Sequence, residues 1–424
     1  MDLRRKLGQL PPPSGEKRAS APEPDSSNRE TTLAELRARM AKLLEQGALP
    51  MEPAPLSNAW ETTLPFVVRA TEFGEFSWRS ELLAPSHHVG RIPTSAAHAA
   101  NAALLALLAL DPGLSGVDPR GALYIDTETT GLGGSGAIAF LIGMAWFEGE
   151  SLRLEQVLLR SPAEEKAGLR VVAERIHQAS LLVSYNGKSF DLPLLATRAV
   201  MNREPSLPVR PHLDLLHVAR RLHRTRLGAC KLTTLESEIL GFERGPDIQG
   251  GDIPARYSHF LRTGDEEALR DVVEHNAFDV VSMAALVGLY GEPLGGLHEQ
   301  DLVALARTFH RAGDATRADE AIEHALQRGA GVQAIRARGE IAKARGDRAR
   351  ALADFETLVV ELDDSQARLE LSKLYEHYAK EPLKALNLAL LGTSEAAEAQ
   401  SRRVSRLSRK VERAQHRSKT TKRS

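Results

Sequence analysis

The chain has 424 residues, a formal net charge of −1 and a single cysteine. This length suggests two or three domains, and a hydrophobic content of 42% is enough to build their cores. One cysteine, Cys230, excludes an internal disulfide and a cysteine-rich zinc module. The near-zero charge excludes a global positive field that would attract nucleic acid.

The N-terminal part of the chain has basic residues but no apolar signal core, and the densest apolar run, Ala99 to Leu110, is too short to span a membrane. We therefore expect a cytoplasmic protein without a membrane partner. Residues 1–30 are rich in proline, serine and charge and are predicted to be disordered. Residues 31–57 are predicted to form a helix, with leucines at helical spacing, followed by a proline-rich linker.

The pattern over residues 58–290 predicts an α/β domain. Apolar and alternating stretches predict strands, and amphipathic stretches predict helices. The predicted strands are 66–68, 76–78, 122–128, 137–147, 152–159 and 181–185, with a further one within 206–214, and the predicted helices are 93–110, 163–178 and 191–201, with mostly helix from there to Tyr290. Three antiparallel strands followed by alternating helices and strands indicate a mixed central sheet flanked by helices.

Asp126 and Glu128 come at the end of the first long predicted strand, after the apolar residues 122–125. Side chains two residues apart on a strand point to the same face, so both carboxylates project from one side of the sheet. Unpaired like charges at this spacing repel each other, and a divalent ion would remove the repulsion. Ligands that are all oxygen favour magnesium or manganese. The pair by itself is equally compatible with a solvated strand end.

Two later motifs contribute further carboxylates. Asp191 ends the segment NGKSFD after an apolar strand, so it can present a carboxylate over the sheet or simply cap the next helix. His275 and Asp279 are four residues apart on a predicted helix and therefore share one of its faces. In isolation, a helix cap explains Asp191 better, and an exposed ion pair explains His275 and Asp279 better.

The three motifs are specific in combination. The order D-x-E, N-x-x-x-F-D and H-x-x-x-D resembles the DEDD superfamily of 3′-to-5′ exonucleases, which has a ribonuclease-H-like fold. A closer resemblance, over about residues 58–290, is to the YprB-like ribonuclease-H-like family. It is carried by the segments YIDTETTGLGGSGAIAFLIGMAWF, LLVSYNGKSFDLPLL, DLLHVARRL, CKLTTLESEILGF and HNAFDV. The resemblance implies metal-dependent hydrolysis of phosphodiester bonds.

The resemblance also implies roles for individual residues. The acids Asp126, Glu128, Asp191 and Asp279 match the DEDD positions that hold two Mg²⁺ or Mn²⁺ ions. One DEDD class has a histidine five residues before the last aspartate, and the other has a tyrosine four before it. Here His275 stands at the tyrosine spacing and Glu274 at the histidine spacing. We expect His275 to orient or deprotonate the attacking water, and Glu274 is the alternative base.

Residues 298–392 have short, paired, alanine-rich helical patterns. Gly313-Asp314 and Gly346-Asp347 recur 33 residues apart, which resembles tetratricopeptide repeats. The match is degenerate, because the large aromatic near the repeat start is absent and the third turn lacks its glycine. A generic array of helical hairpins is the alternative. Residues 393–424 are predicted to form a basic C-terminal helix or tail.

Several other polar residues are weaker candidates. His212 and Asp214 are expected to be structural or distant groove residues, and a turn is the expected role of Asn186-Gly187, although Asn186 and Lys188 could touch a phosphate. The basic run 220–226 is compatible with a nucleic-acid contact or with a solvated helix face.

The sequence leaves three functions to compare. The first is a metal-dependent nuclease, most simply a 3′-to-5′ exonuclease on RNA or single-stranded DNA. The second is a module of the same fold that binds nucleic acid or protein without turnover. The third is a scaffold in which the repeats bind a protein partner. Four converging carboxylates favour the nuclease, since a binding module has no need of them.

Overall fold

The computed structural model describes residues 64–131, 136–245, 247–292 and 296–421, without the side chains of 417–421. The predicted disordered segment 1–30 and the predicted helix and linker at 31–57 lie outside these residues.

Within the described part of the chain, seven strands form one mixed sheet in the order β1-β2-β7-β6-β5-β8-β9. In this order β1, β2, β7, β6 and β5 are antiparallel to their neighbours. The last three strands, β5, β8 and β9, are parallel to one another. The strands are β1 Val67–Thr71, β2 Gly74–Leu83, β5 Ala122–Thr129, β6 Ala139–Glu148, β7 Ser151–Leu158, β8 Leu181–Ser184 and β9 His212–Asp214, and a separate ribbon pairs β3 His88–Val89 with β4 Ile92–Pro93. The mixed sheet predicted from the sequence is therefore present.

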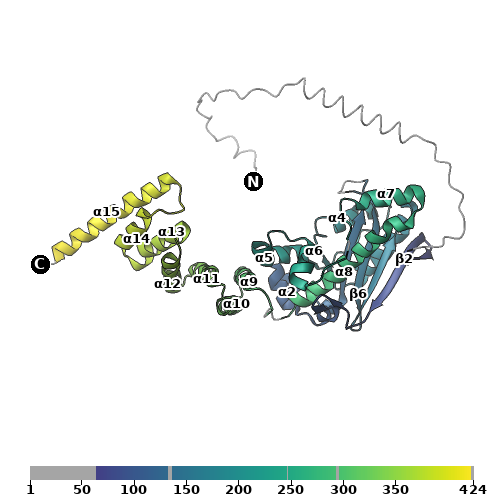
Figure 1. Cartoon of the computed structure of the whole chain (residues 1–424), viewed down its shortest axis with the longest axis horizontal. Coiled ribbons are helices and arrows are strands. Elements are labelled where there is room, and N and C mark those ends of the chain that lie inside the picture. The colour runs from purple at the N-terminus through teal and green to yellow at the C-terminus, as the bar shows by residue number, and fades with distance from the viewer. Residues whose placement is uncertain (1–63, 132–135, 246, 293–295, 422–424) are drawn as a thin grey trace, which may run out of the picture. The chain divides into compact units, whose positions relative to one another are not determined.

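Helices cover both faces of this sheet (Figure 1). The α/β part contains α2 Ala102–Ala109, α3 Glu165–Gln178, α4 Asp191–Met201, α5 Leu215–Leu227, α6 Leu232–Leu235, α7 Ile253–Thr263 and α8 Arg270–Tyr290. Short 3-10 turns occur at Thr94–Ala99, Pro112–Leu114, Pro119–Gly121, Pro162–Glu164 and Glu266–Leu269, and a π-helical turn at Glu236–Leu240. Apolar residues of α3 and α4 pack on one face of β5 and β6, and α8 packs on the other.

The predicted helix 93–110 is interrupted. The structure has a 3-10 turn to Ala99 and then α2 from Ala102, whose first turn is capped by the Asn101 side chain at Leu104 N. Asparagine at a helix N-cap accepts a hydrogen bond from an otherwise unpaired backbone N–H, so a new helix starts there. The apolar pattern continues across this break, which is why the pattern alone suggested one helix.

Gly143 on β6 lets α8 approach the sheet next to the acidic strand. It is the register partner of Asp126 on β5. A Cβ atom at Gly143 would lie 2.2 Å from Asn276 Oδ1 and 2.8 Å from Val280, both on α8. Any side chain at this position would displace the side chains of Asn276 and Val280. The glycine therefore leaves room for Asn276 beside Asp126.

α8, with the turn before it, is also the one helix in the described residues that is long and apolar enough to cross a membrane by length and composition, over Glu266–Tyr290. Because 67% of its apolar window is buried inside the protein, the helix is accounted for as the core helix of this fold.

The C-terminal region is helical, which is consistent with the predicted repeats. Its helices are α9 Glu299–Ala312, α10 Ala315–Gln327, α11 Gly331–Arg345, α12 Arg348–Glu361, α13 Ser365–Leu374, α14 Pro382–Leu390 and α15 Ala397–Thr421, with a π-helical turn at Tyr375–Ala379. Gly313 and Gly346 end α9 and α11 at φ of 85° and 86°, and Asp314 and Asp347 cap the following helices. In the third hairpin Lys380 takes the left-handed position, at φ of 59°.

Candidate active site

The first two acids lie on β5, on the face covered by α8. Asp126 accepts a hydrogen bond from Asn276 Nδ2, at 2.9 Å from its Oδ2. Glu128 follows two residues later, and its side chain is buried. The intervening Thr127 points the other way, because side chains alternate along a strand. The alternation predicted from the sequence is thus the local reason that both carboxylates lie on one side.

Asp191 is the first residue of α4, and its carboxylate accepts a hydrogen bond from the Thr127 hydroxyl. The preceding turn, from Ser184 to Lys188, is held by Asp214, whose oxygens accept the backbone N–H groups of Asn186 at 2.8 Å and of Lys188 at 3.2 Å. Asp214 is buried and also caps α5, so of its two expected roles the structure shows the structural one. The role of Asp191 is more than a helix cap, because its carboxylate is directed to the strand that bears the other acids.

His275 and Asp279 lie on α8, where His275 Nε2 is 3.7 Å from Asp279 Oδ2. The other ring nitrogen, Nδ1, is 2.7 Å from Asp247 Oδ1, so an Nδ1–H donates to Asp247 and Nε2 is directed to the side of Asp279. Glu274, the alternative base, is exposed and lines a separate cavity with Phe278. Of the two candidates, it is His275 that lies among the acids.

The electrostatics show that the four acids converge. Burial raises the pKa of Asp126 well above its ordinary value, and the charges of Asp279, Asp191 and Glu128 raise it further. Burial also raises the pKa of Glu128 to about 7 and that of Asp191 to about 6. Burial lowers the pKa of His275, but Asp279, Asp247 and Glu128 outweigh it and raise the pKa above its usual value. Asp126, Glu128 and Asp191 therefore lie in a buried environment that disfavours their ionised forms.

The burial of the Glu128 carboxylate makes the stability of the fold depend on pH. Its pKa is 4.5 in the unfolded chain and about 7 in the fold, so the folded state binds the proton more tightly. The free energy of unfolding therefore falls by roughly 3 kcal/mol as the pH rises from 4.5 to about 7, so the protein becomes less stable. We expect Glu128→Gln, in chelator, to become more stable than wild type by this amount at pH 8 and to match it near pH 4.

Urea unfolding followed by tryptophan fluorescence measures this difference. Trp78 on β2 and Trp146 on β6 report the sheet, and residues 298–424 contain no tryptophan. A difference between variant and wild type that stays constant from pH 4 to pH 8 would contradict the prediction.

A buried arginine that the sequence motifs did not indicate lies beside these acids. Arg244 is held by Glu236, whose Oε1 and Oε2 each accept a hydrogen bond from the guanidinium at 2.7 Å. Its remaining N–H groups face Asp279, Asp247 and His275. Asn276 was also missed, although it lies within the segment HNAFD. Arg244 stands alone in a loop rich in glycine and acids, where no pattern in the sequence marks it.

The donor set fits a divalent ion, although the side chains are not yet arranged around one. Four carboxylates from β5, α4 and α8 supply the oxygen ligands that Mg²⁺ and Mn²⁺ prefer, and a bound cation would favour the ionised forms of Asp126, Glu128 and Asp191, whose pKa values are raised by burial. Within the described residues, no three acidic, histidine or cysteine side chains are grouped closely enough to hold a metal ion as they stand. Asp126, Asp191 and Asp279 are instead turned to Asn276, Thr127 and Arg244.

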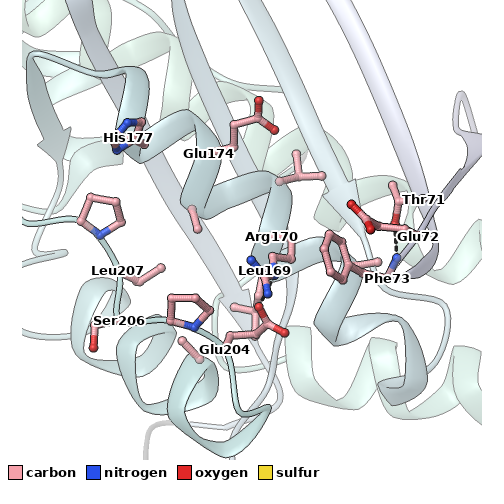
Figure 2. A pocket seen from close by; sticks show the side chains of 16 residues that line it. Thr71, Glu72, Phe73, Leu169, Arg170, Glu174, His177, Glu204, Ser206 and Leu207 are labelled. Carbon is pink, nitrogen blue, oxygen red and sulfur yellow. Dashed lines mark hydrogen bonds and ion pairs between the residues drawn. The ribbon is translucent and has the colours of Figure 1, made fainter.

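One large cavity among the described residues is separate from this site. Its volume is about 750 Å³, and it lies beside α3 and the segment after α4. Figure 2 shows Arg170 between Phe73 and Glu204 on its wall, where the guanidinium carbon is 4.4 Å from the centre of the Phe73 ring. None of the five predicted site residues lines this cavity, so it is not part of the acidic cluster.

The basic run 220–226 serves mainly to hold helices together. Arg226 forms an ion pair of 2.9 Å with Asp301 on α9, His223 is fully buried, and Arg221 donates to the backbone of α2 at Leu108. These three residues of the run are therefore engaged in packing. The exposed cations of the run are Arg220 and Arg224.

Much of the positive charge of the C-terminal helix α15 is likewise engaged. Glu376 in the third hairpin has a fully buried side chain and pairs with Arg403, Arg406 and Lys410. Burial raises the pKa of Glu376, but hydrogen bonds from Arg406 and Lys410 outweigh it and lower the pKa to about 2. Leu407 is fully buried as well. From Arg403 to Lys410 the predicted basic tail is thus a helix docked on the third hairpin.

We expect Glu376→Ala to release α15 from the repeats. Loss of a charge partner common to three cations should make trypsin cleavage within α15 faster by about tenfold or more, because ~1.4 kcal/mol of docking energy corresponds to a factor of ten. Glu398→Ala is the matched control, since its carboxylate is 88% exposed and lies 3.9 Å from Arg402. Equal cleavage rates in the two variants would show that Glu376 does not hold the helix.

The chain is similar to a protein family, to a bacterial protein and to a solved structure. A family model described as the RNase_H superfamily matches residues 123–290, which include all five predicted site residues. "Uncharacterized protein YprB" from Bacillus subtilis (strain 168) is 33% identical over 297 residues, which span 66% of this chain and 71% of the relative. The family B DNA polymerase of the archaeon Pyrobaculum calidifontis is 16% identical with a TM-score of 0.33, over 49% of this chain and 28% of the polymerase chain.

Proposed function

Because the chain belongs to the YprB-like family of the RNase H superfamily, we propose that it is a metal-dependent nuclease that hydrolyses phosphodiester bonds in RNA or single-stranded DNA, from the 3′ end. The single observation that carries this proposal is the convergence of four carboxylates, three of which have pKa values raised chiefly by burial. Such an accumulation of charge is costly in a metal-free fold and is useful when cations are bound.

Each side chain has a role in this proposal. Asp126, Glu128, Asp191 and Asp279 would hold the metal ions. Two divalent ions, when bound, would supply water activation and stabilisation of the leaving oxygen. His275 accepts a proton from, or orients, the attacking water through Nε2, and Asp247 keeps the ring in that orientation through its hydrogen bond with Nδ1.

The test is an assay with the full chain. Single-stranded RNA and DNA, each labelled at the 5′ end, are incubated with the protein in Mn²⁺, Mg²⁺ or chelator, beside an Asp126→Ala control. The proposal expects shortening of the labelled strand one nucleotide at a time, dependent on metal and absent in the control. Products cut at internal positions would support a nuclease but contradict the 3′-to-5′ direction. Strands that stay intact under all conditions would contradict the nuclease function.

A second candidate is a binding module of the same fold. It is favoured by the hydrogen bonds that already turn Asp126, Asp191 and Asp279 to protein donors, because a module without turnover has no need to release them. Calorimetry with Mn²⁺ separates the two functions. The nuclease requires Mn²⁺ binding that is lost in Asp126→Ala, whereas a binding module does not.

A further inference from the structure

Arg244 is the only arginine of the described residues whose hydrogen-bond partners include one of the four predicted metal ligands. Its side chain is 5% exposed and Glu236 is 1% exposed, whereas Asp279 and Asp247 are 17% and 22% exposed. Glu236 therefore anchors the guanidinium from the protein interior. The solvent side of the group faces the acids and His275.

All five N–H groups of the Arg244 guanidinium have neighbours. Nε and one Nη2 hydrogen go to Glu236, and the second Nη2 hydrogen goes to Asp279. Nη1 is 3.2 Å from Asp247 Oδ2 and 3.1 Å from His275 Nδ1. Because His275 Nδ1 donates to Asp247, the Nη1 contact with the ring is a close approach rather than a good hydrogen bond. The Nη2 hydrogen that faces Asp279 and the Nη1 hydrogen that faces His275 are thus the ones that could change their partner when a ligand binds.

We propose that Arg244 is a substrate-binding residue of this site, which contacts the phosphate group to be cleaved. The inference rests on the proposed nuclease function. A metal ion held by Asp279 would share the negative charge of that carboxylate, so the hydrogen bond from Arg244 Nη2 to Asp279 would weaken and Nη2 could donate to the substrate instead. A phosphate oxygen is the complementary acceptor at that position, and a guanidinium fixed on one edge by a buried carboxylate is already oriented for it.

The same geometry gives Arg244 a role before substrate binds. In the metal-free protein it pairs with Asp279, which lies beside three other carboxylates that form no ion pair with any of the described residues. An arginine that merely supported the fold would also hold the acids in place, so its loss would weaken both metal binding and catalysis. If Arg244 instead contacts the substrate, its loss should weaken catalysis and leave metal binding unchanged or stronger.

Two substitutions distinguish these roles. Arg244→Lys keeps the charge but loses the two-pronged contact with Glu236. The double variant Arg244→Gln with Glu236→Gln removes both charges together, so that no unpaired carboxylate is left buried. Arg338→Lys in α11 is the matched control, because Arg338 makes a similar two-pronged pair with the buried Asp354 in the repeats.

Two measurements are made on each full-length protein, namely Mn²⁺ affinity by calorimetry without substrate, and KM and kcat on labelled single strands. We expect the double variant to bind Mn²⁺ as tightly as wild type or more tightly, while kcat/KM falls on the order of 10- to 100-fold, as for loss of a charged hydrogen bond. Arg244→Lys should retain Mn²⁺ affinity and lose several-fold in kcat/KM. Arg338→Lys should change neither.

Weaker Mn²⁺ binding in step with activity in both Arg244 variants would make Arg244 structural and overturn the inference, as would an unchanged kcat/KM. If the double variant does not fold, Arg244→Lys alone decides between these outcomes. If the wild-type protein shows no Mn²⁺-dependent turnover, the proposed nuclease function is contradicted, and the role inferred for Arg244 is contradicted with it.

Discussion

Asp126→Asn is expected to lower the rate of metal-dependent phosphodiester hydrolysis by roughly three orders of magnitude, because bound metal contributes several kcal/mol of transition-state stabilisation. The same variant should be more stable than wild type in chelator. Burial and the charges of Asp279, Asp191 and Glu128 all disfavour the ionised Asp126, and an amide can still accept the hydrogen bond from Asn276. Single-turnover rates and urea midpoints measure the two effects on one preparation.

Asp279→Asn is the informative comparison. It should lose activity to the same extent but should not gain stability, because Asp279 is already neutralised by Arg244. An amide at this position would remove the ion pair with Arg244. Normal turnover in both variants would remove the assignment of these acids as metal ligands. A gain in stability in Asp279→Asn equal to that in Asp126→Asn would show that Arg244 does not pair with Asp279.

His275→Ala is expected to lower the rate by roughly 10²–10⁴-fold, the usual contribution of a positioned general base. Mn²⁺ affinity should change little, since His275 is not among the predicted metal ligands. His275→Tyr should recover part of the rate, because the related DEDD class has tyrosine at this spacing. Rates at saturating metal, with Mn²⁺ affinity measured separately, test this result.

Glu274→Ala is the control that the structure offers for His275. Glu274 is the neighbouring residue on the same helix, but it is exposed and lines a cavity with Phe278 rather than the acidic cluster. Its loss should leave the rate unchanged. An inactive Glu274→Ala protein together with an active His275→Ala protein would assign the base to Glu274.

Asp247→Asn addresses the orientation of the His275 ring. The carboxylate accepts the Nδ1–H at 2.7 Å, and an asparagine can present either an oxygen or an amide group to that nitrogen. We expect a smaller fall in rate than in His275→Ala, because the ring is kept and only its preferred tautomer and orientation are lost. A rate equal to wild type would show that the packing of α8 orients the ring without Asp247.

The sequence by itself determined the features that depend on short periods. Asp126 and Glu128 share a face because strand side chains alternate, and His275 and Asp279 share one because they are four apart on a helix. The glycine–aspartate pairs at 313–314 and 346–347 likewise end and cap their helices as the spacing suggests. The mixed sheet also followed from the order of apolar segments.

Only the tertiary structure decided what neutralises these charges. Arg244 reaches Asp279 across 35 residues of sequence, and Arg226 reaches Asp301 across 75. Local patterns carry no information on such pairs, because a charged residue looks the same in sequence whether its partner is water or a carboxylate of another element. For the same reason the basic run 220–226 was compatible in sequence with a nucleic-acid contact, while packing turns Arg226 to the buried Asp301. Burial, not composition, decides which charges remain available for a ligand.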